Sequence, residues 1–169
     1  GQSQAVTVLK KRSKGEGQVT IFQAFPHSPT VIIVSLKNLQ SLAGGYHIHI
    51  LPIIVGSSDP CSNANILGHF NPLDWNTSSS PSPGVGTVDQ YEIGDISGKF
   101  GMLTGQNDFQ RIYMDPNMPL TGPYSIMGRS TAHVMQSKCI SDIYSMILLW
   151  LLLTVGNVAA KLCCRLVLI

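Results

Sequence analysis

The chain has 169 residues, the size of one domain with a core of its own. Only 12% of its residues are charged, against roughly 25% in ordinary soluble domains, while 44% are hydrophobic. The net charge of +2 is too small to predict a nucleic-acid-binding protein, and no basic stripe is interleaved with aromatic residues. The four cysteines form neither a paired CxxC zinc pattern nor a dense disulfide scaffold.

Short alternating or β-branched stretches, separated by Gly and Pro, run through the first 135 residues. We expect strands at residues 5–10, 18–24, 30–36 and 109–114, and one further strand that contains His47 and His49. No stretch before residue 140 shows a convincing helical period. The pattern predicts an all-β fold, either a Greek-key β-barrel or a β-sandwich.

Two long connections separate these strands. Residues 53–72 form the first, and a loop of this length in a compact domain is usually functional. Residues 74–88 are rich in Ser, Pro and Gly, a composition that predicts an exposed and poorly ordered segment. This second connection contains Asn76-Thr77-Ser78, an acceptor pattern for N-linked glycosylation that fits a secreted protein.

Three of the five histidines lie within residues 45–72. His47 and His49 are two positions apart, and this spacing puts both side chains on one face of a strand. His69 follows on the next loop, beyond Cys61. Histidine pairs of this spacing also occur by chance in β-proteins, but the third histidine favours a metal site. Imidazole ligands suit Cu, Zn, Fe or Ni.

The order Gly-Tyr-His-Ile-His, then Cys61, then Gly-His-Phe-Asn-Pro resembles the metal-binding core of the copper/zinc superoxide dismutases. The similarity runs, with gaps, over residues 5–129. It implies an immunoglobulin-like Greek-key barrel or sandwich of about eight strands, with residues 1–135 as the copper-binding domain. It also implies copper as the cofactor, superoxide as the substrate, and four copper ligands: His47, His49, His69 and His133.

The zinc site of that family is incomplete in this sequence. The two-metal enzymes bind zinc through a bridging histidine, two further histidines and an aspartate. Here His69 would be the bridge and Asp95 is in place, but the other histidines are replaced near Thr77 and at Glu92. This pattern resembles the extracellular copper-only branch, in which a glutamate takes over from zinc. The resemblance therefore implies no zinc, and catalytic roles for His69 and for Glu92 as its hydrogen-bond partner. The alternative is that Glu92 and Asp95 merely cap a turn.

The fourth ligand and the anion-guiding cation depart from the family pattern. Residues 126–133 resemble the family strand that carries the fourth ligand, and the resemblance implies a strand there. The family strand reads Gly-Arg-Ser/Thr-x-Val-Val-His, but here Gly128 and His133 are five positions apart instead of six. One missing residue turns a side chain to the other face of a strand unless a bulge restores it. The family's guiding arginine has no clear counterpart. If residues 156–166 are a degraded version of the family's last strand, the resemblance implies that Lys161 stands in its place, with a catalytic role in attracting superoxide.

Residues 136–169 form an apolar tail with several interpretations. Residues 143–160 carry no charge and reach the lower length for a membrane-spanning helix, and basic residues follow them. A tail of this kind could instead be a lipid-anchor signal. A third interpretation is a degraded last strand, in which the resemblance implies a disulfide between Cys61 and Cys164. A fourth is an end that derives from an alternative exon.

Two functions follow from these expectations. The first is an antioxidant oxidoreductase, an extracellular or cell-surface superoxide dismutase that uses copper to convert superoxide to dioxygen and hydrogen peroxide. The alternative is a catalytically silent β-sandwich that serves as a cell-surface binding module. Three matching ligands and Glu92 favour the enzyme. The shifted His133 and the missing arginine favour the binding module.

Overall fold

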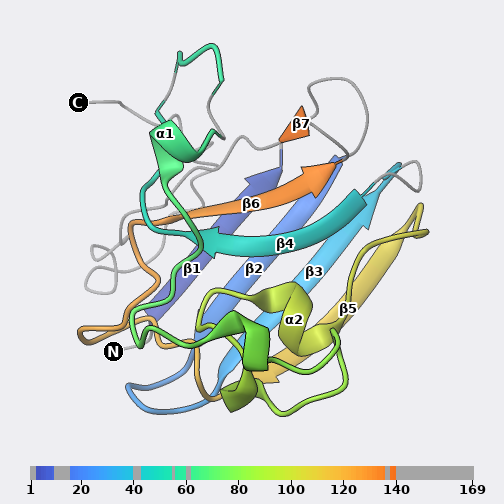
Figure 1. The fold of residues 1–169 in the computed structure, drawn as a ribbon. Helices are drawn as coiled ribbons and strands as arrows, with labels where there is room; N and C mark the ends of the chain where they lie inside the picture. The colour runs from blue at the N-terminus through green and yellow to red at the C-terminus, as the bar shows by residue number, and fades with distance from the viewer. Residues whose placement is uncertain are drawn as a thin grey trace, which may run out of the picture.

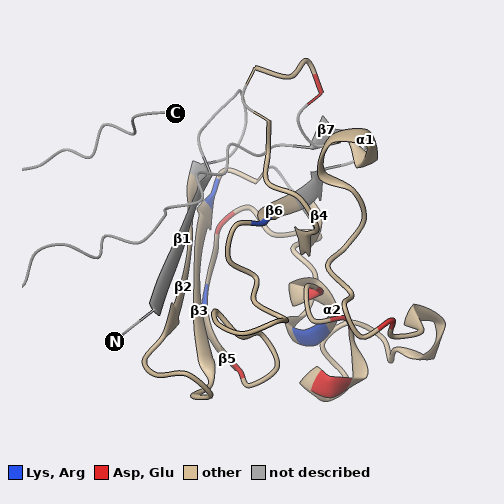
Figure 2. Ribbon diagram, turned by 90° about the vertical axis from the view of Figure 1, so that its left-hand side faces the viewer, with Lys and Arg blue, Asp and Glu red and all other residues tan. Residues whose placement is uncertain are grey.

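The structure is a computed structural model that describes residues 3–9, 16–39, 43–54, 56–59, 62–135 and 138–139. Within these residues the strands form two antiparallel sheets, which Figure 1 shows crossing each other and Figure 2 shows from the side. One sheet has the strand order β1-β2-β3-β5, and the other has the order β4-β6-β7. The prediction of an all-β fold of the sandwich type is confirmed.

The larger sheet consists of β1 (Ser3–Leu9), β2 (Glu16–Gln23), β3 (Thr30–Lys37) and β5 (Phe109–Asp115). The smaller sheet consists of β4 (Ala43–His49), β6 (Ser130–Met135) and β7 (Lys138–Cys139). The strands expected from the sequence are present, but β6 begins four residues later than residue 126, where the expected strand began. A turn delays it, because Gly128 has a φ of 74°, a left-handed conformation that a strand cannot contain.

The core lies between the two sheets. Ile21, Ile32 and Val34 of the larger sheet are each at most 1% exposed, and Tyr46 and Ile48 of β4 are each 2% exposed. Burying such a side chain contributes roughly 1.5–3 kcal/mol. Side chains alternate along a strand, so the burial of Tyr46 and Ile48 turns the residues between and after them to the opposite face of β4.

Short helical turns lie in the connections between the strands. They are α1 (Asn63–Ile66), η1 (Thr77–Ser79), η2 (Val88–Gln90) and α2 (Ile96–Phe100). The α2 helix packs against β4. Asp95 caps its N-terminus by accepting a hydrogen bond from the backbone N–H of Gly98. A helix of five residues is too short to leave a helical period in the sequence.

The segment 74–88 is not the poorly ordered connection that its composition predicts. Two residues that flank it fix its course by hydrogen bonds. The Asn71 side chain donates to the backbone carbonyl of Trp75 and accepts from its N–H, both at 2.9 Å. The hydroxyl of Tyr91 accepts from the N–H of Gly86 at 2.8 Å and donates to the carbonyl of Ser82 at 2.9 Å. The prediction was wrong because composition records turn-forming residues but not the specific bonds that order them.

Candidate metal centre

Three segments that are distant in the sequence meet beside β4 through a closed set of backbone hydrogen bonds. The N–H of Ile48 donates to the carbonyl of Gly94, and the N–H of Gly94 donates to the carbonyl of Phe70. The N–H of Phe70 then donates back to the carbonyl of Ile48 at 2.7 Å. Each of these residues is a neighbour of a predicted site residue. The backbone therefore brings together the strand with His47 and His49, the loop with His69, and the turn with Glu92 and Asp95.

Gly94 is required for this junction. A Cβ added to it would lie 2.7 Å from the carbonyl oxygen of Ile48 and 3.1 Å from side-chain atoms of Ile48 and Phe70. Real Cβ atoms essentially never approach a backbone atom so closely. Only glycine lets the turn pack directly on β4.

The three predicted histidines lie in ring contact. The rings of His47 and His69 are stacked with centroids 3.9 Å apart and planes inclined by 14°. The ring of His49 meets that of His69 edge-on, with centroids 5.2 Å apart and planes inclined by 89°. The sequence therefore predicted correctly that these three side chains converge.

Each of the three rings has one nitrogen bound to the protein. Nδ1 of His49 lies 2.8 Å from the carbonyl oxygen of Leu67, and Nδ1 of His69 lies 2.9 Å from Oε2 of Glu92. Carbonyl and carboxylate oxygens only accept hydrogen bonds, so both Nδ1 atoms carry the proton. Nε2 of His47 lies 3.0 Å from Oγ of Ser97. The nitrogens left for a metal are Nε2 of His49, Nε2 of His69 and Nδ1 of His47.

The Nδ1 atom of His47 is the clearest sign of a missing partner. It is buried and has no hydrogen-bond partner among the described residues. Leaving a buried polar atom unsatisfied costs about 1–3 kcal/mol, so such an atom in a native fold calls for an explanation such as an ion. The ring also occupies space that only glycine leaves open, because a Cβ on Gly45 would lie 2.5 Å from its Cε1. A metal bound at Nδ1 fits both observations.

As placed, the side chains do not yet form a coordination sphere. No group of three His, Cys, Asp or Glu side chains in the described part of the chain is arranged to hold a metal ion. The stacking explains this, since nitrogen lone pairs lie in the ring plane and those of parallel rings do not meet at one point. The set of donor nitrogens fits copper, and the rings of His47 and His69 must separate to bind it.

Burial and hydrogen bonds set the protonation of His49 and Asp95 at this centre. Burial lowers the pKa of His49, and the neighbouring rings of His69 and His47 lower it further against the Leu67 hydrogen bond. The imidazole is thereby favoured in its neutral form, which binds metals. Burial alone would raise the pKa of Asp95, but hydrogen bonds from His47, Gly98 and Ser97 outweigh it and the pKa lies below its ordinary value.

The two predicted carboxylates contact different histidines. Glu92 is 7% exposed and pairs with His69, as described above. Oδ1 of Asp95 lies 3.3 Å from Nε2 of His47 and also accepts the α2 cap bond. One carboxylate therefore both caps a helix and faces a histidine.

A buried ion pair supports the turn that carries these carboxylates. Nζ of Lys99 donates to the carbonyl of Ile93 at 2.9 Å and to Oδ2 of Asp115 at 2.7 Å, with both charged side chains 0% exposed. Burial lowers the pKa of Lys99, and Asp115 opposes that shift. Arg129 supports the other side of the centre. It donates to the carbonyl of Ile50, and its guanidinium carbon lies 3.6 Å from the ring centroid of Phe70.

The other predicted site residues are less completely placed. The β4–β6 register pairs His133 with Tyr46 and Ala132 with His47, and the β4 strand has an irregularity between Ala43 and Tyr46. The side chain of His133 lies outside the described residues, and so do Cys61, Lys161 and Cys164. Their roles stay predictions. The apolar stretch 143–160 is also outside the described part, within which no helix has the length and hydrophobicity to span a membrane.

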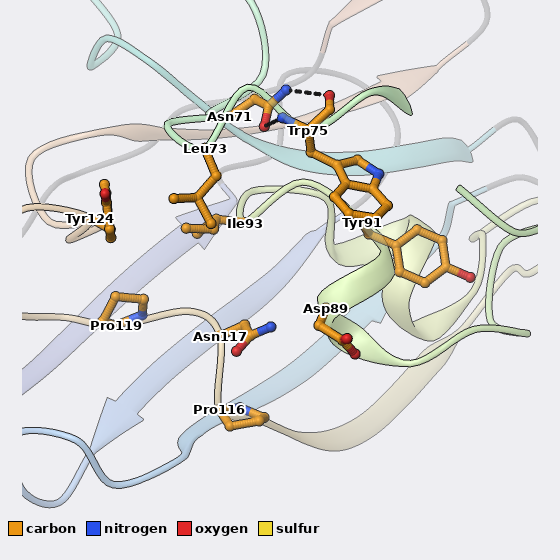
Figure 3. Close-up of a pocket in the computed structure, with 10 residues that line it drawn as sticks. All are labelled: Asn71, Leu73, Trp75, Asp89, Tyr91, Ile93, Pro116, Asn117, Pro119 and Tyr124. Atoms are coloured by element: carbon orange, nitrogen blue, oxygen red, sulfur yellow. Dashed lines mark hydrogen bonds between the residues drawn. The ribbon is translucent and has the colours of Figure 1, made fainter. Parts of the chain in front are cut away.

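A separate cavity of about 400 Å³ lies behind the Glu92 turn (Figure 3). Tyr91 and Ile93 line it on either side of Glu92 in the sequence, and Trp75, Leu73 and Tyr124 also line it. None of the histidines contributes to its lining. The cavity is therefore distinct from the metal centre.

Sequence reasoning missed three residues of the centre: Gly45, Gly94 and Ser97. Gly45 begins the Gly-Tyr-His-Ile-His pattern and Gly94 lies between Glu92 and Asp95, so the sequence contained these glycines without showing why they are needed. Ser97 is 1% exposed and touches both His47 and Asp95. Nothing in its sequence context marks it as different from a turn serine.

Comparison with known proteins gives relatives of one kind in sequence. No family model matches the chain. It is 30% identical over 121 residues to the cell surface superoxide dismutase Cu-Zn 4 of Candida albicans, a match covering 71% of this chain and 48% of that protein. The chain thus spans about half the length of this relative. It is 29% identical over 127 residues to the Cu-Zn superoxide dismutase of Cordyceps militaris, covering 75% of this chain and 74% of that one.

The fold has solved counterparts. A mutant of superoxide dismutase 5 from Candida albicans aligns with a TM-score of 0.63 at 23% identity, over 86% of this chain and 93% of that one. The clock protein EA4 aligns with a TM-score of 0.57 at 19% identity, over 78% and 74%. At these identities the likeness concerns the fold alone. The sequence relatives, the fold and the histidine pattern agree, and all three are similar to those of the copper/zinc superoxide dismutases.

Proposed function

We propose that this chain is a superoxide dismutase that binds one copper ion and no zinc. The observation that carries the proposal is the arrangement of the three histidines, each with one nitrogen bound to the protein and the other left over. The ligand atoms would be Nδ1 of His47, Nε2 of His49 and Nε2 of His69. His133 is the proposed fourth ligand, on β6 beside β4.

The copper-only part of the proposal rests on this chain's own residues, since the curated relatives are named for both metals. The Nδ1 atom of His69, which would face zinc in a two-metal site, is already bound by Glu92. Thr77, near the position of a lost zinc histidine, is exposed on η1. A closed zinc site needs four good ligands, and Asp95 already serves the α2 cap and His47.

The chemistry that copper supplies is one-electron exchange, in which one superoxide is oxidised to dioxygen and a second takes up one electron and two protons to form hydrogen peroxide. His49 and His69 present Nε2 because their Nδ1–H groups are held by Leu67 and Glu92. Nε2 of His69 is the group proposed to carry a proton during turnover. Glu92 keeps that ring oriented while its Nε2 is free of metal.

We place this activity outside the cell or at its surface. The name of the Candida relative supports this location, although the chain spans only about half of that protein. Lys161 is the proposed cation that attracts superoxide, and a disulfide between Cys61 and Cys164 would bring the tail back to the domain. A membrane anchor at residues 143–160 excludes that disulfide, because a cysteine beyond the membrane faces a reducing compartment.

The test is superoxide consumption by the copper-loaded chain beside two histidine variants. His69→Ala removes a proposed ligand, whereas His27→Ala removes an exposed histidine in a turn of the larger sheet. We expect rapid consumption by the parent and by His27→Ala, and loss of activity in His69→Ala. Equal, slow decay in all three would refute the enzyme and support the alternative, a silent surface-binding module.

A further inference from the structure

The hydrogen bonds around His47 contain a positioning residue that the family resemblance does not point to. Oγ of Ser97 lies 3.0 Å from Nε2 of His47 and donates to Oδ1 of Asp95 at 3.1 Å. A serine hydroxyl has one proton. Since that proton goes to Asp95, the same oxygen can only accept from His47. The Nε2 atom of His47 must then carry the ring proton.

The carboxylate of Asp95 favours the same tautomer. Its Oδ1 lies 3.3 Å from Nε2 of His47, and an ionised carboxylate accepts hydrogen bonds but donates none. The backbone N–H of Gly98, at 2.6 Å, holds this oxygen in place. An unprotonated Nε2 would face two oxygens without a proton between them, a repulsive arrangement in a buried site.

The proton on Nε2 determines the state of Nδ1, the other nitrogen of the ring. A neutral imidazole has one N–H and one lone pair, so a proton on Nε2 leaves the lone pair on the buried, unpartnered Nδ1. His49 and His69 are fixed in the opposite tautomer by Leu67 and Glu92. His47 therefore needs a hydrogen-bond partner of its own that favours the Nε2–H tautomer.

We propose that Ser97 is a positioning residue that holds His47 in the Nε2–H tautomer and so presents Nδ1 to the metal. This rests on the proposed function, because the metal is copper bound at that centre. Without the hydroxyl, Nε2 keeps only the longer contact with Asp95, and the ring is free to change tautomer or to turn. Loss of such an outer partner typically costs about 10- to 100-fold in metal affinity.

The experiment compares the parent with Ser97→Ala and Thr30→Val in the full chain. Thr30 lies on β3 in the larger sheet, is 0% exposed, and donates its hydroxyl to the carbonyl of Met118. Thr30→Val therefore also deletes a buried hydroxyl, but one that contacts no histidine. Nitrogen NMR of the metal-free chain reads the tautomer of His47, and competition titration reads copper affinity. We expect Nε2–H in the parent and in Thr30→Val, and a mixed tautomer with about 10-fold weaker copper binding in Ser97→Ala.

Three outcomes separate the two proposals. An Nδ1–H tautomer in the parent overturns the role of Ser97 whether or not copper binds. An unchanged tautomer and unchanged affinity in Ser97→Ala overturn it as well while leaving the copper site standing. A parent that binds no copper, with the tautomer still dependent on Ser97, refutes the proposed function but leaves the serine as the residue that fixes His47. If Ser97→Ala does not fold, Ser97→Thr keeps a hydroxyl and should restore the Nε2–H form.

An independent observation concerns Asn76. It begins the one N-x-Ser/Thr sequence of the chain and is exposed, as are Thr77 and Ser78. Its Oδ1 accepts from the N–H of Ser78 at 3.1 Å and from the Ser78 hydroxyl at 2.7 Å. Both hydrogen bonds are accepted by the oxygen Oδ1. The amide nitrogen Nδ2 takes part in neither of them and belongs to an exposed side chain.

The geometry points to Asn76 as a site of N-linked glycosylation when the chain passes through a secretory pathway. The donor is an oligosaccharide joined to a lipid pyrophosphate. A bond forms between Nδ2 of Asn76 and C1 of the first sugar, the bond from C1 to the pyrophosphate oxygen breaks, lipid pyrophosphate leaves and the amide loses one proton. No electrons change hands. The fold accommodates the product because the whole acceptor sequence is exposed.

The test uses the full chain with a secretory leader in a eukaryotic host, analysing cell-associated and secreted chain together. Peptide mass spectrometry after amidase removal of N-glycans reads conversion of Asn76 to aspartate. The parent and Thr77→Ala, which keeps the acceptor sequence, should carry the glycan, and Ser78→Ala should lack it. An unmodified Asn76 in the parent overturns this site.

Discussion

Nδ1 of His69 lies 2.9 Å from Oε2 of Glu92, in a pair whose carboxylate is only 9% exposed. This contact takes up the ring nitrogen that a second metal would need. It also links the loop after α1, which carries His69, to the turn before α2, which carries Glu92. In the proposed copper-only site, this contact is what distinguishes the centre from a site for two metals.

Replacing Glu92 should weaken the centre without unfolding the domain. In Glu92→Gln the side chain keeps its shape but accepts from Nδ1 of His69 through a neutral oxygen, which binds less strongly than a carboxylate. We expect about 10-fold lower copper affinity or turnover, measured by competition titration and superoxide decay. Asp89→Asn, which changes an exposed carboxylate on η2, is the control and should leave both unchanged. Parent-like values for Glu92→Gln would mean that Glu92 only shapes the turn.

Space beside His47 gives a second prediction. A methyl group at position 45 would lie 2.5 Å from Cε1 of His47, so Gly45→Ala must displace the ring. We expect copper affinity to fall by at least about 10-fold. Gly68→Ala is the matched control beside His69, because an added Cβ there meets nothing within 4 Å. Similar copper affinities for the two variants would contradict the placement of the His47 ring.

The buried pair of Lys99 and Asp115 predicts a large effect on stability. Lys99→Met leaves the carboxylate without its partner, which typically costs about 3–5 kcal/mol. Urea unfolding followed by tryptophan fluorescence should show this loss. The double variant Lys99→Met with Asp115→Asn should recover part of it, because no buried charge remains and the amide oxygen can still accept from the N–H of Asn117. If the double variant loses as much unfolding free energy as Lys99→Met, an uncompensated buried charge is not the cause of the loss.

The lowered pKa of His49 predicts how the metal-free chain responds to acid. The folded-state pKa lies below the ordinary 6.5, so the folded chain binds fewer protons than the unfolded chain in the window between the two values. Stability from this group is complete above the unfolded pKa and falls as the pH drops through that window. Asp95 adds its own loss only further down, below 3.8.

The free energy of unfolding in urea should therefore be lower at about pH 5 than at about pH 7. The difference should shrink in His49→Asn, which cannot take up the proton. A pH dependence of the same size in the variant would assign the effect to other groups.

Much of the fold could be predicted because its strands are regular. The alternation of β3, with Ile32 and Val34 buried and Ile33 exposed, appears directly in the sequence. The spacing of His47 and His49 likewise fixes their common face. The short α2 helix could not be predicted, because a single cap at Asp95 starts it and five residues show no period.

At the candidate centre, the sequence could predict the convergence of three histidines and the contact between Glu92 and His69, but not the backbone junction that joins them. The closed set of hydrogen bonds among Ile48, Phe70 and Gly94 joins positions far apart in the sequence, and no spacing rule reports it. Ser97 reaches His47 only because that junction brings α2 onto β4.

Metal stoichiometry tests the central claim most directly. The purified chain is stripped of metal, exposed to copper and zinc together in equal excess, freed of loosely bound ions and analysed for both elements. The account predicts one copper and no zinc per chain, with a copper spectrum showing nitrogen ligands that is lost in His47→Ala. Retention of one zinc beside the copper would contradict the copper-only centre, and absence of copper would contradict the centre altogether.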